Sequence, residues 1–216
     1  MRKSKPNTIP SREAEEGLWK EGKCLVCGLD EAGRGALAGP LVAGAVILPR
    51  RRIYRLRDSK TIPPRTREKL ADHIKGVAVS WATGVAEVEE IDRYGIQSAT
   101  YMAFYRAIER LKVKPDCLLV DFYRLPACEL RQISLTFGDK TSQTIAAASI
   151  LAKVARDELM REIAGEPEAN IYQFDKNFGY GTGGHLKGIA KAGASRFHRK
   201  EFTKKFFNNQ TRLFEK

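Results

Sequence analysis

Two short apolar runs, each ending in acidic residues, limit the fold of this chain more than any other feature. The run Cys24–Leu29 leads into Asp30 and Glu31, and the run Leu118–Val120 leads into Asp121. Such runs are typical of central strands that are covered on both faces. A carboxylate at the end of a buried strand is costly to desolvate unless it is paired or binds a cation. The runs therefore predict a buried sheet with a polar site at its strand ends.

Further strands and helices alternate along the remainder of the chain. Small and β-branched apolar residues predict strands at 41–48, 77–85 and 132–137, in addition to 24–30 and 117–121. Helical spacing and helix-start residues predict helices at 63–74, 96–111 and 141–163, with a short one near 14–19. In a chain of 216 residues this alternation indicates a single α/β domain at 23–216, after a flexible polar lead-in at 1–22.

The charge of the chain favours a polyanionic partner. Lys and Arg number 38 against 26 Asp and Glu, which gives a formal net charge of +12. Six basic residues lie between Arg50 and Lys60, and nine lie between Lys187 and Lys216. Such stretches are usually solvated surface, but their concentration here favours a surface that follows nucleic-acid phosphates.

A membrane partner is not expected. The chain has no apolar run of about 18 residues, and no apolar segment follows its basic N-terminus. We therefore expect a cytoplasmic protein. Cys24 and Cys27 have C-x-x-C spacing, but Cys117 and Cys128 do not form a second such pair, so reduced thiols are favoured over a zinc site.

The acidic residues at the strand ends predict a metal site. Asp30, Glu31 and Asp121 follow predicted strands, and Asp157 lies on the long helix predicted at 141–163. Taken singly, any of them could be a cap or a salt-bridge partner. Several carboxylates at one end of a sheet, in a basic protein, indicate hard divalent cations that hold phosphate oxygens. Because neighbouring strand residues point to opposite faces, Asp30 and Glu31 share a site only where the strand ends or kinks.

Several blocks of the sequence resemble ribonuclease HII. The first is Gly28–Pro40, which reads GLDEAGRGALAGP, and another is Ile145–Asp157, which reads IAAASILAKVARD. Shorter similarities are Asp58-Ser59-Lys60, Tyr180-Gly181-Thr182 before His185-Leu186, and His198-Arg199 before Phe202. The blocks occur in order from about residue 28 to 202.

The resemblance implies the ribonuclease H-like fold, a five-stranded mixed sheet flanked by helices, with a helical C-terminal portion. It implies an endonuclease that cuts RNA/DNA hybrids and DNA duplexes with embedded ribonucleotides, in RNA primer removal and ribonucleotide excision repair. The cut falls on the 5′ side of the ribonucleotide and leaves 3′-hydroxyl and 5′-phosphate ends. The family's four metal-binding carboxylates match Asp30, Glu31, Asp121 and Asp157, which would hold two Mg²⁺ or Mn²⁺ ions.

The resemblance also implies that residues 23–216 are the catalytic domain and that its basic C-terminal portion, 176–216, binds substrate. It assigns individual substrate contacts as well. Gly33, Arg34, Gly35 and Tyr180 match residues that read the RNA–DNA junction, where the 2′-hydroxyl distinguishes RNA. Phosphate contacts are expected from Ser59, Lys60 and Lys153. A tyrosine more often packs in a core, and a helical lysine is more often simply solvated. The family usually has glycine after the aspartate that matches Asp121, whereas this chain has Phe122.

The C-terminal peptide carries a separate hypothesis. Residues 210–214 read QTRLF, which resembles the peptide by which bacterial replication proteins bind the sliding clamp. Gln210, Leu213 and Phe214 would be its contacts, and a frayed or packed tail is the alternative. Two rival functions remain: ribonuclease HIII, which carries an extra N-terminal domain, and a non-catalytic nucleic-acid-binding protein of the same fold.

Overall fold

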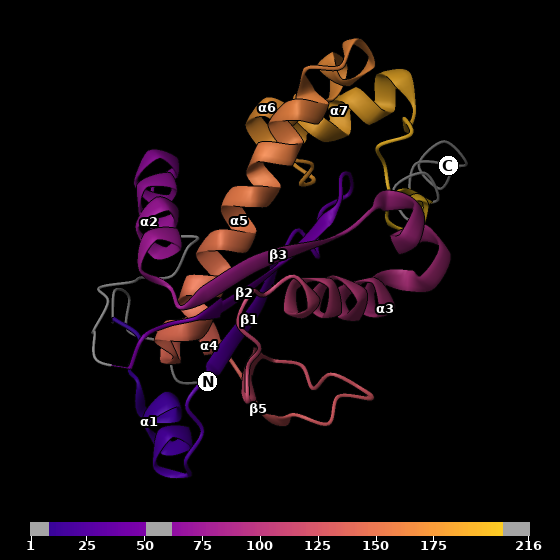
Figure 1. The fold of residues 1–216 in the computed structure, drawn as a ribbon. Helices are drawn as coiled ribbons and strands as arrows, with labels where there is room; N and C mark the ends of the chain where they lie inside the picture. The colour runs from indigo at the N-terminus through magenta and orange to yellow at the C-terminus, as the bar shows by residue number, and fades with distance from the viewer. Residues whose placement is uncertain (1–8, 51–61, 205–216) are drawn as a thin grey trace, which may run out of the picture.

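A computed structural model describes residues 9–50 and 62–204, which form a five-stranded mixed sheet flanked by helices (Figure 1). The strands are β1 Val26–Ala32, β2 Leu41–Ile47, β3 Ser80–Ala86, β4 Cys117–Asp121 and β5 Arg131–Leu135. Their order across the sheet is β3-β2-β1-β4-β5. β1, β2 and β3 pair antiparallel, whereas β1, β4 and β5 pair parallel. The predicted fold class is confirmed.

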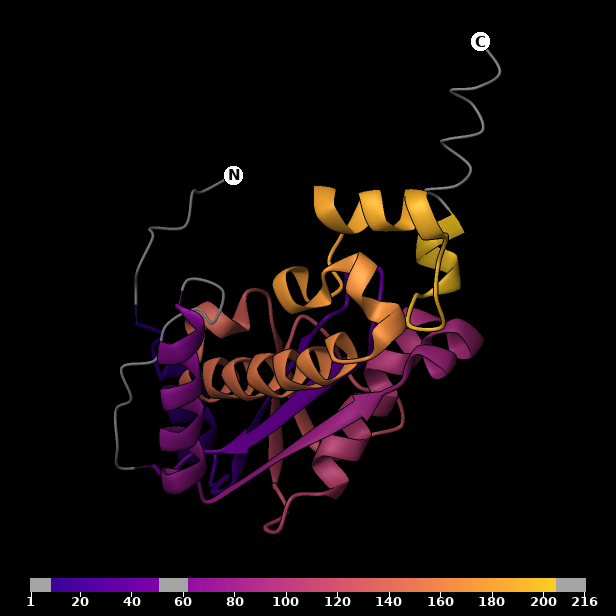
Figure 2. The same cartoon turned by 90° about the horizontal axis from the view of Figure 1, so that it is seen from above.

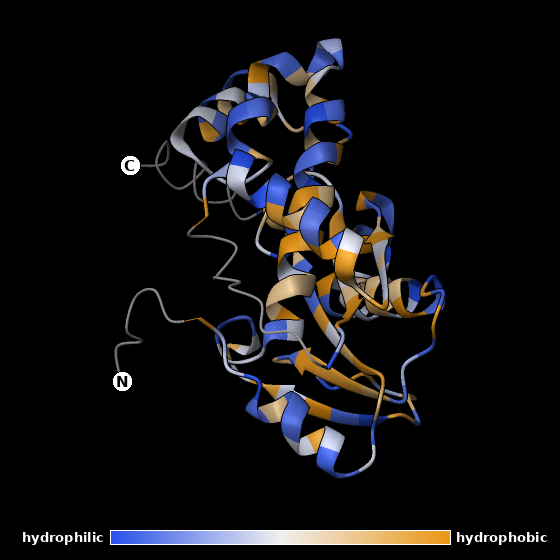
Figure 3. Ribbon diagram, turned by 60° about the vertical axis from the view of Figure 1, so that its left-hand side comes forward, coloured by the Kyte–Doolittle hydropathy of each residue, from blue (hydrophilic) through white to orange (hydrophobic). Residues whose placement is uncertain are grey.

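Helices cover both faces of the central strands (Figure 2). Helix α5, Gln143–Ala164, lies on one face beside α2, Pro64–Val77, and α3, Val88–Glu109, lies on the other. Small residues allow this close approach: a Cβ on Gly44 would lie 2.3 Å from the Ala148 carbonyl oxygen of α5. The strands are coloured mostly as hydrophobic in Figure 3, and β1, β2 and β4 are buried along almost their whole length, as expected for strands covered on both faces.

The largest differences from the predicted element boundaries concern α2, β3 and α3. α2 continues to Val77, so β3 begins at Ser80 and not at residue 77. α3 begins at Val88, well before the predicted residue 96, because Glu87 and Glu90 form a capping box there. Gly95, with φ 79°, interrupts the helical backbone, and the predicted helix corresponds to the part after this kink.

The predicted short helix near residues 14–19 is present as α1, Glu13–Lys20. It is packed against the domain: Leu18 is 1% exposed and lies in an apolar cluster with Val26, Leu119 and Ile145. We expected residues 1–22 to be flexible, but the burial of Leu18 shows that α1 is attached to the sheet.

A helical C-terminal portion follows α5 and lies at the end of the molecule away from α1 (Figure 1). It contains the 3₁₀ helix η2, Pro167–Tyr172, and the helices α6, Phe174–Asn177, and α7, Gly183–Ala192. Its apolar cluster is built around Met160, Tyr172, Phe174 and Ile189. No helix in the described part of the chain is long and apolar enough to cross a membrane.

Candidate active site

Asp30 and Asp121 lie next to each other at the ends of two parallel strands. Leu29 of β1 pairs with Val120 of β4, so the residues that follow them come side by side. Asp30 is 5% exposed, and the neighbouring Ser149 of α5 hydrogen-bonds its side chain. Burial raises the pKa of Asp30 well above its usual value, and repulsion from Glu31, Asp121 and Asp139 raises it further. Asp30 and Asp121 therefore lie close together, as the sequence predicted for the ends of these strands.

Glu31 joins this group although neighbouring residues of a strand ordinarily point to opposite faces of the sheet. Its backbone N–H donates a 2.7 Å hydrogen bond to Asp30 Oδ1. β1 continues to Ala32 and turns at Gly33, whose φ of 93° favours glycine. Because the turn follows directly, Glu31 lies at the sheet's end and lines two adjoining clefts, one with Asp121 and Asp139 and one with Tyr180.

Asp139 belongs to the acidic group and was not among the predicted site residues. It lies on α4, Gly138–Thr141, a single turn that follows β5, and it is 3% exposed. The preceding Gly138 N–H donates a 2.7 Å hydrogen bond to Asp121 Oδ1, which joins this turn to the end of β4. Glu31, Asp121 and Asp139 line one cleft of about 450 Å³. An acidic residue just after a strand was the available signal, because β5 is parallel to β4.

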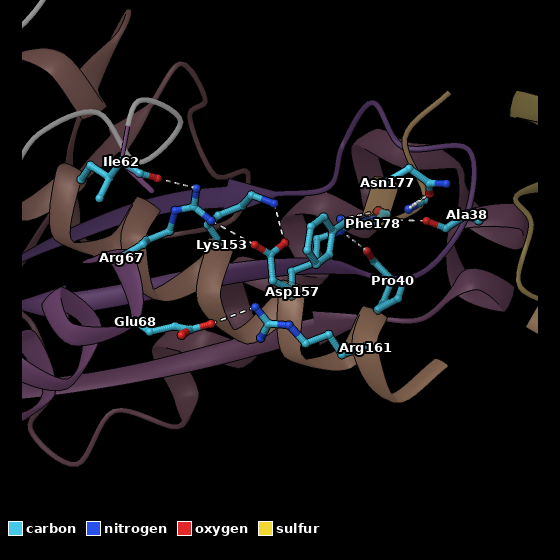
Figure 4. A network of polar contacts seen from close by, with 12 residues as sticks. Ala38, Pro40, Ile62, Arg67, Glu68, Lys153, Asp157, Arg161, Asn177 and Phe178 are labelled. Atoms are coloured by element: carbon cyan, nitrogen blue, oxygen red, sulfur yellow. Dashed lines mark hydrogen bonds and ion pairs between the residues drawn. The ribbon is translucent and has the colours of Figure 1, made fainter. Parts of the chain in front are cut away.

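Asp157 is not brought to this group, which corrects the predicted set of carboxylates. It lies on α5 eight residues beyond Ser149, which at 1.5 Å per residue is about 12 Å along the helix. Its Oδ2 accepts a 3.0 Å hydrogen bond from Arg67 Nη1 of α2, and Lys153 forms an ion pair with its Oδ1 (Figure 4). Asp157 therefore joins α2 to α5, and two cations already satisfy its charge.

The acidic group fits a divalent cation in its chemistry. Asp30, Glu31, Asp121 and Asp139 supply hard carboxylate oxygens, the ligands that Mg²⁺ and Mn²⁺ prefer. A bound cation would also remove the repulsion that raises the pKa of Asp30. Within residues 9–50 and 62–204, no three side chains of His, Cys, Asp or Glu already stand in an arrangement that holds an ion.

Most of the predicted substrate residues line a second cleft, of about 470 Å³, which adjoins the acidic group at Glu31. The predicted residues in its lining are Gly33, Arg34, Gly35, Lys153 and Tyr180. Their convergence agrees with a common binding role. Ser59 and Lys60, and the peptide residues Gln210, Leu213 and Phe214, lie outside the described residues.

Two buried arginines hold the loop at 33–40, and sequence reasoning did not find this role. Arg199 is fully buried and donates six hydrogen bonds to carbonyl oxygens of the loop, among them Gly33 at 2.8 Å and Gly39 at 2.8 and 2.9 Å. Arg156, also fully buried, donates to Ala38 and Pro40. A Cβ on Gly33 would lie 1.9 Å from Arg156 Nε, so this glycine is needed for packing as well as for its positive φ.

Two buried histidines hold Tyr180 through its backbone. The Tyr180 carbonyl lies 2.9 Å from His185 Nδ1, and His185 Nε2 lies 3.0 Å from His198 Nε2. The carbonyl only accepts, so His185 carries its proton on Nδ1 and His198 donates from Nε2. The Tyr180 ring lies near two cations, 5.7 Å from Lys153 Nζ and 5.2 Å from Arg156 Cζ.

Two predicted substrate cations have partners within the protein. Arg34 donates to Gln97 Oε1 at 3.0 Å, and its guanidinium lies 4.8 Å from the centre of the Tyr123 ring. Lys153 pairs with Asp157, and burial lowers the pKa of its ammonium group. The Arg34 side chain is therefore directed toward α3 and Tyr123, and its backbone remains beside the cleft.

The family model of ribonuclease HII matches residues 27–209 of this chain. The chain belongs to the ribonuclease HII family. It is therefore a ribonuclease H, an endoribonuclease that acts on RNA/DNA hybrids.

Related sequences agree over most of their length. The chain is 43% identical to ribonuclease HII of Caldicellulosiruptor bescii, over 89% of this chain and 93% of the relative. It is 46% identical to ribonuclease HII of Thermus thermophilus, over 87% of this chain and 90% of the relative.

Solved structures show the same fold. Ribonuclease H2 from Pyrococcus horikoshii matches with a TM-score of 0.68 and 26% identity, over 83% of this chain and 95% of that one. A ribonuclease HII from Archaeoglobus fulgidus, in complex with PCNA, matches with a TM-score of 0.66 and 24% identity, over 83% and 94%. A ribonuclease HIII in complex with Mn²⁺ shares the fold at 18% identity and a TM-score of 0.58, over 79% of this chain and 63% of that one.

Proposed function

We propose that this ribonuclease HII cuts the phosphodiester on the 5′ side of a ribonucleotide, both in RNA/DNA hybrids and in DNA duplexes with embedded ribonucleotides. The products would carry 3′-hydroxyl and 5′-phosphate ends, as RNA primer removal and ribonucleotide excision repair require. The observation that carries the proposal is the meeting of Asp30, Glu31 and Asp121 with Asp139 at the end of the sheet, beside the cleft of Tyr180.

The four carboxylates would hold the metal ions of the reaction, either Mg²⁺ or Mn²⁺. When bound, two such ions supply an activated water and stabilise the leaving oxygen. Asp30 and Asp121, on adjacent strands, would be the central ligands, with Glu31 and Asp139 on either side. Asp157, which the sequence resemblance included, is replaced by Asp139 in this proposal.

The loop at 33–40 and Tyr180 would select the ribonucleotide. Arg199 and Arg156 hold loop carbonyls on the buried side, so these oxygens face away from the substrate. The N–H groups of residues 36–39 donate within the protein, so the part of the loop that can present backbone N–H groups to a 2′-hydroxyl or a phosphate is 33–35. The two guanidinium charges beneath the loop favour an anion. The Tyr180 ring would pack against the neighbouring sugar. Lys153 would move from Asp157 toward a phosphate, and Ser59 and Lys60 would add phosphate contacts.

A nicking assay tests the proposal. A labelled DNA duplex with a single ribonucleotide is incubated with Mg²⁺, with Mn²⁺, or with EDTA, and the product ends are mapped. We expect metal-dependent nicking on the 5′ side in the wild type, and a loss of nicking with retained duplex binding in Asp121→Asn and Asp139→Asn. Binding without nicking by the wild type would favour the non-catalytic alternative.

We also propose that the C-terminal peptide binds a sliding clamp. Its sequence supports this, as does the fold similarity to a ribonuclease HII that is found in complex with PCNA. A pull-down with a bacterial clamp should be lost in the Leu213→Ala and Phe214→Ala double variant and retained in a Lys216→Ala control. Equal capture of the double variant would exclude this role for the peptide.

A further inference from the structure

We propose that Glu15 of helix α1 is a positioning residue for the metal-binding carboxylates. The inference rests on the proposed function, because it concerns Asp121 and Asp139 in the role assigned to them there. Helix α1, which precedes the sheet, would then support metal binding without contacting the substrate.

Glu15 reaches the start of α5, more than a hundred residues away in the sequence. Its side chain is 1% exposed, and its Oε1 accepts three hydrogen bonds. The donors are the Ser142 hydroxyl at 2.8 Å, the Thr144 N–H at 2.9 Å and the Thr144 hydroxyl at 2.9 Å. A carboxylate is favoured here because the first N–H groups of a helix have no partner within the helix.

Further hydrogen bonds connect Ser142, which Glu15 holds, to the acidic group. The Ser142 N–H donates to the Gly138 carbonyl at 2.8 Å, and the Gly138 N–H donates to Asp121 Oδ1 at 2.7 Å. Asp139 lies between these two points, on α4. The turn that carries Asp139 is therefore held by Asp121 on one side and by Glu15, through Ser142, on the other.

The residues before α1 hold the same junction from a second side. Ser11 Oγ donates to the Thr141 carbonyl at 3.0 Å, and the Ser11 carbonyl accepts from the Gln143 N–H at 3.2 Å. The Pro10 carbonyl accepts from Gln143 Nε2 at 3.3 Å. The two residues that flank Ser142 are thus both bound to the N-terminal segment.

The turn needs such external support because of its length. α4 has four residues, too few for a helix to be stable on its own, and it begins after Phe137 in the left-handed backbone region at φ 58°. Removing the Glu15 carboxylate would leave the donors of Ser142 and Thr144 buried without their acceptor. The junction would then relax, and Asp139 would lose its fixed place beside Asp121.

The test compares Glu15→Ala with Glu15→Gln, whose amide oxygen can still accept hydrogen bonds. Mn²⁺ binding is followed by the paramagnetic resonance signal of the free ion, and nicking is measured separately over a range of Mn²⁺ concentrations. Ile74→Val serves as the control, because it removes a buried methyl group from α2, in a different apolar cluster. Thermal unfolding checks that every variant is folded at the assay temperature.

We expect Glu15→Ala to weaken Mn²⁺ binding by about 10- to 100-fold, as observed for partners that orient metal ligands. Glu15→Gln should recover most of this loss, and Ile74→Val should bind as the wild type does. If Glu15→Ala does not fold, Ser142→Ala, which cuts the same path and keeps α1, should show the weakened binding. Unchanged Mn²⁺ binding in a folded Glu15→Ala or Ser142→Ala variant would overturn the inference. If the wild type itself neither binds Mn²⁺ nor nicks, the proposed function fails instead.

Discussion

Acid should destabilise this protein through His198, and the size of the effect follows from its surroundings. His198 is 3% exposed, and its Nδ1 accepts a 2.9 Å hydrogen bond from the Ser195 N–H. Its Nε2 donates to His185, whose own Nδ1–H is held by the Tyr180 carbonyl. Ser195 Oγ also lies 2.9 Å from this Nδ1. A second proton on Nδ1 would nevertheless stand against the N–H of Ser195. Burial therefore favours the neutral form of both rings in the folded protein.

Burial and the neighbouring His185 lower the pKa of His198 from 6.5 to about 4. The unfolded chain therefore binds a proton at His198 between these two pH values, while the folded chain does not. Stability is insensitive to this group above pH 6.5 and falls as the pH drops toward 4. At about 1.4 kcal/mol per pKa unit, the loss is about 3 kcal/mol. Burial also lowers the pKa of His185, which acts in the same direction.

The assay is urea unfolding between pH 7 and pH 4, followed by tryptophan fluorescence. The wild type is compared with His198→Asn, whose amide oxygen can accept the Ser195 N–H but does not titrate. We expect His198→Asn to be less stable at pH 7 and to lose about 3 kcal/mol less than the wild type on acidification. Parallel curves for the wild type and His198→Asn would refute the reasoning.

Three further predictions concern other positions. Phe122→Gly should raise the free energy of unfolding, measured by urea titration, by up to about 1 kcal/mol, because Phe122 has φ 62° and its side chain is 65% exposed. A free energy of unfolding below that of the wild type would show that the Phe122 ring stabilises the fold. Asp157→Asn should lower the free energy of unfolding by about 3 kcal/mol in the same measurement, since it leaves Arg67 and Lys153 without their carboxylate. The folded variant should still nick, and a loss of nicking in folded protein would show that Asp157 takes part in the reaction. Arg199→Lys should lower the melting temperature by about 6–12 °C, because a single ammonium group cannot replace six guanidinium hydrogen bonds. An unchanged melting temperature would contradict the role of Arg199 in holding the loop at 33–40.

Two buried cations lie beside the cleft lined by Gly33 and Tyr180. Arg156 and Arg199 are both buried, and the hydrogen bonds of each go to backbone carbonyl oxygens. Burial and the charge of Arg156 lower the pKa of Arg199 to about 9. Two buried cations that repel each other are unfavourable for the free protein, and a bound phosphate would reduce that repulsion.

Local sequence patterns were enough to predict an α/β domain with acidic residues at its strand ends, and the resemblance to ribonuclease HII added the five-stranded mixed sheet. The apolar runs before Asp30 and Asp121 required central strands, and parallel neighbouring strands that end in carboxylates must bring them together. The short helix near residue 14 also followed from local pattern. The start of α3 at Val88 did not, because a capping box with Glu87 at the N-cap is unusual and Gly95 hides the continuity of the helix.

The membership of Asp139 and the exclusion of Asp157 depended on tertiary structure. Asp139 lies just before the long helix α5 and Asp157 lies within it. Both are acidic, so their local sequence does not show which of them joins Asp30 and Asp121. Their positions along α5 do: Asp139 precedes the helix beside the end of β4, and Asp157 lies far along it, against Arg67 of a different helix. The contacts of Glu15, Arg199 and the two histidines were likewise visible only in the fold. Each acts on a segment distant in the sequence, and hydrogen bonds between distant segments leave no periodic pattern in the chain.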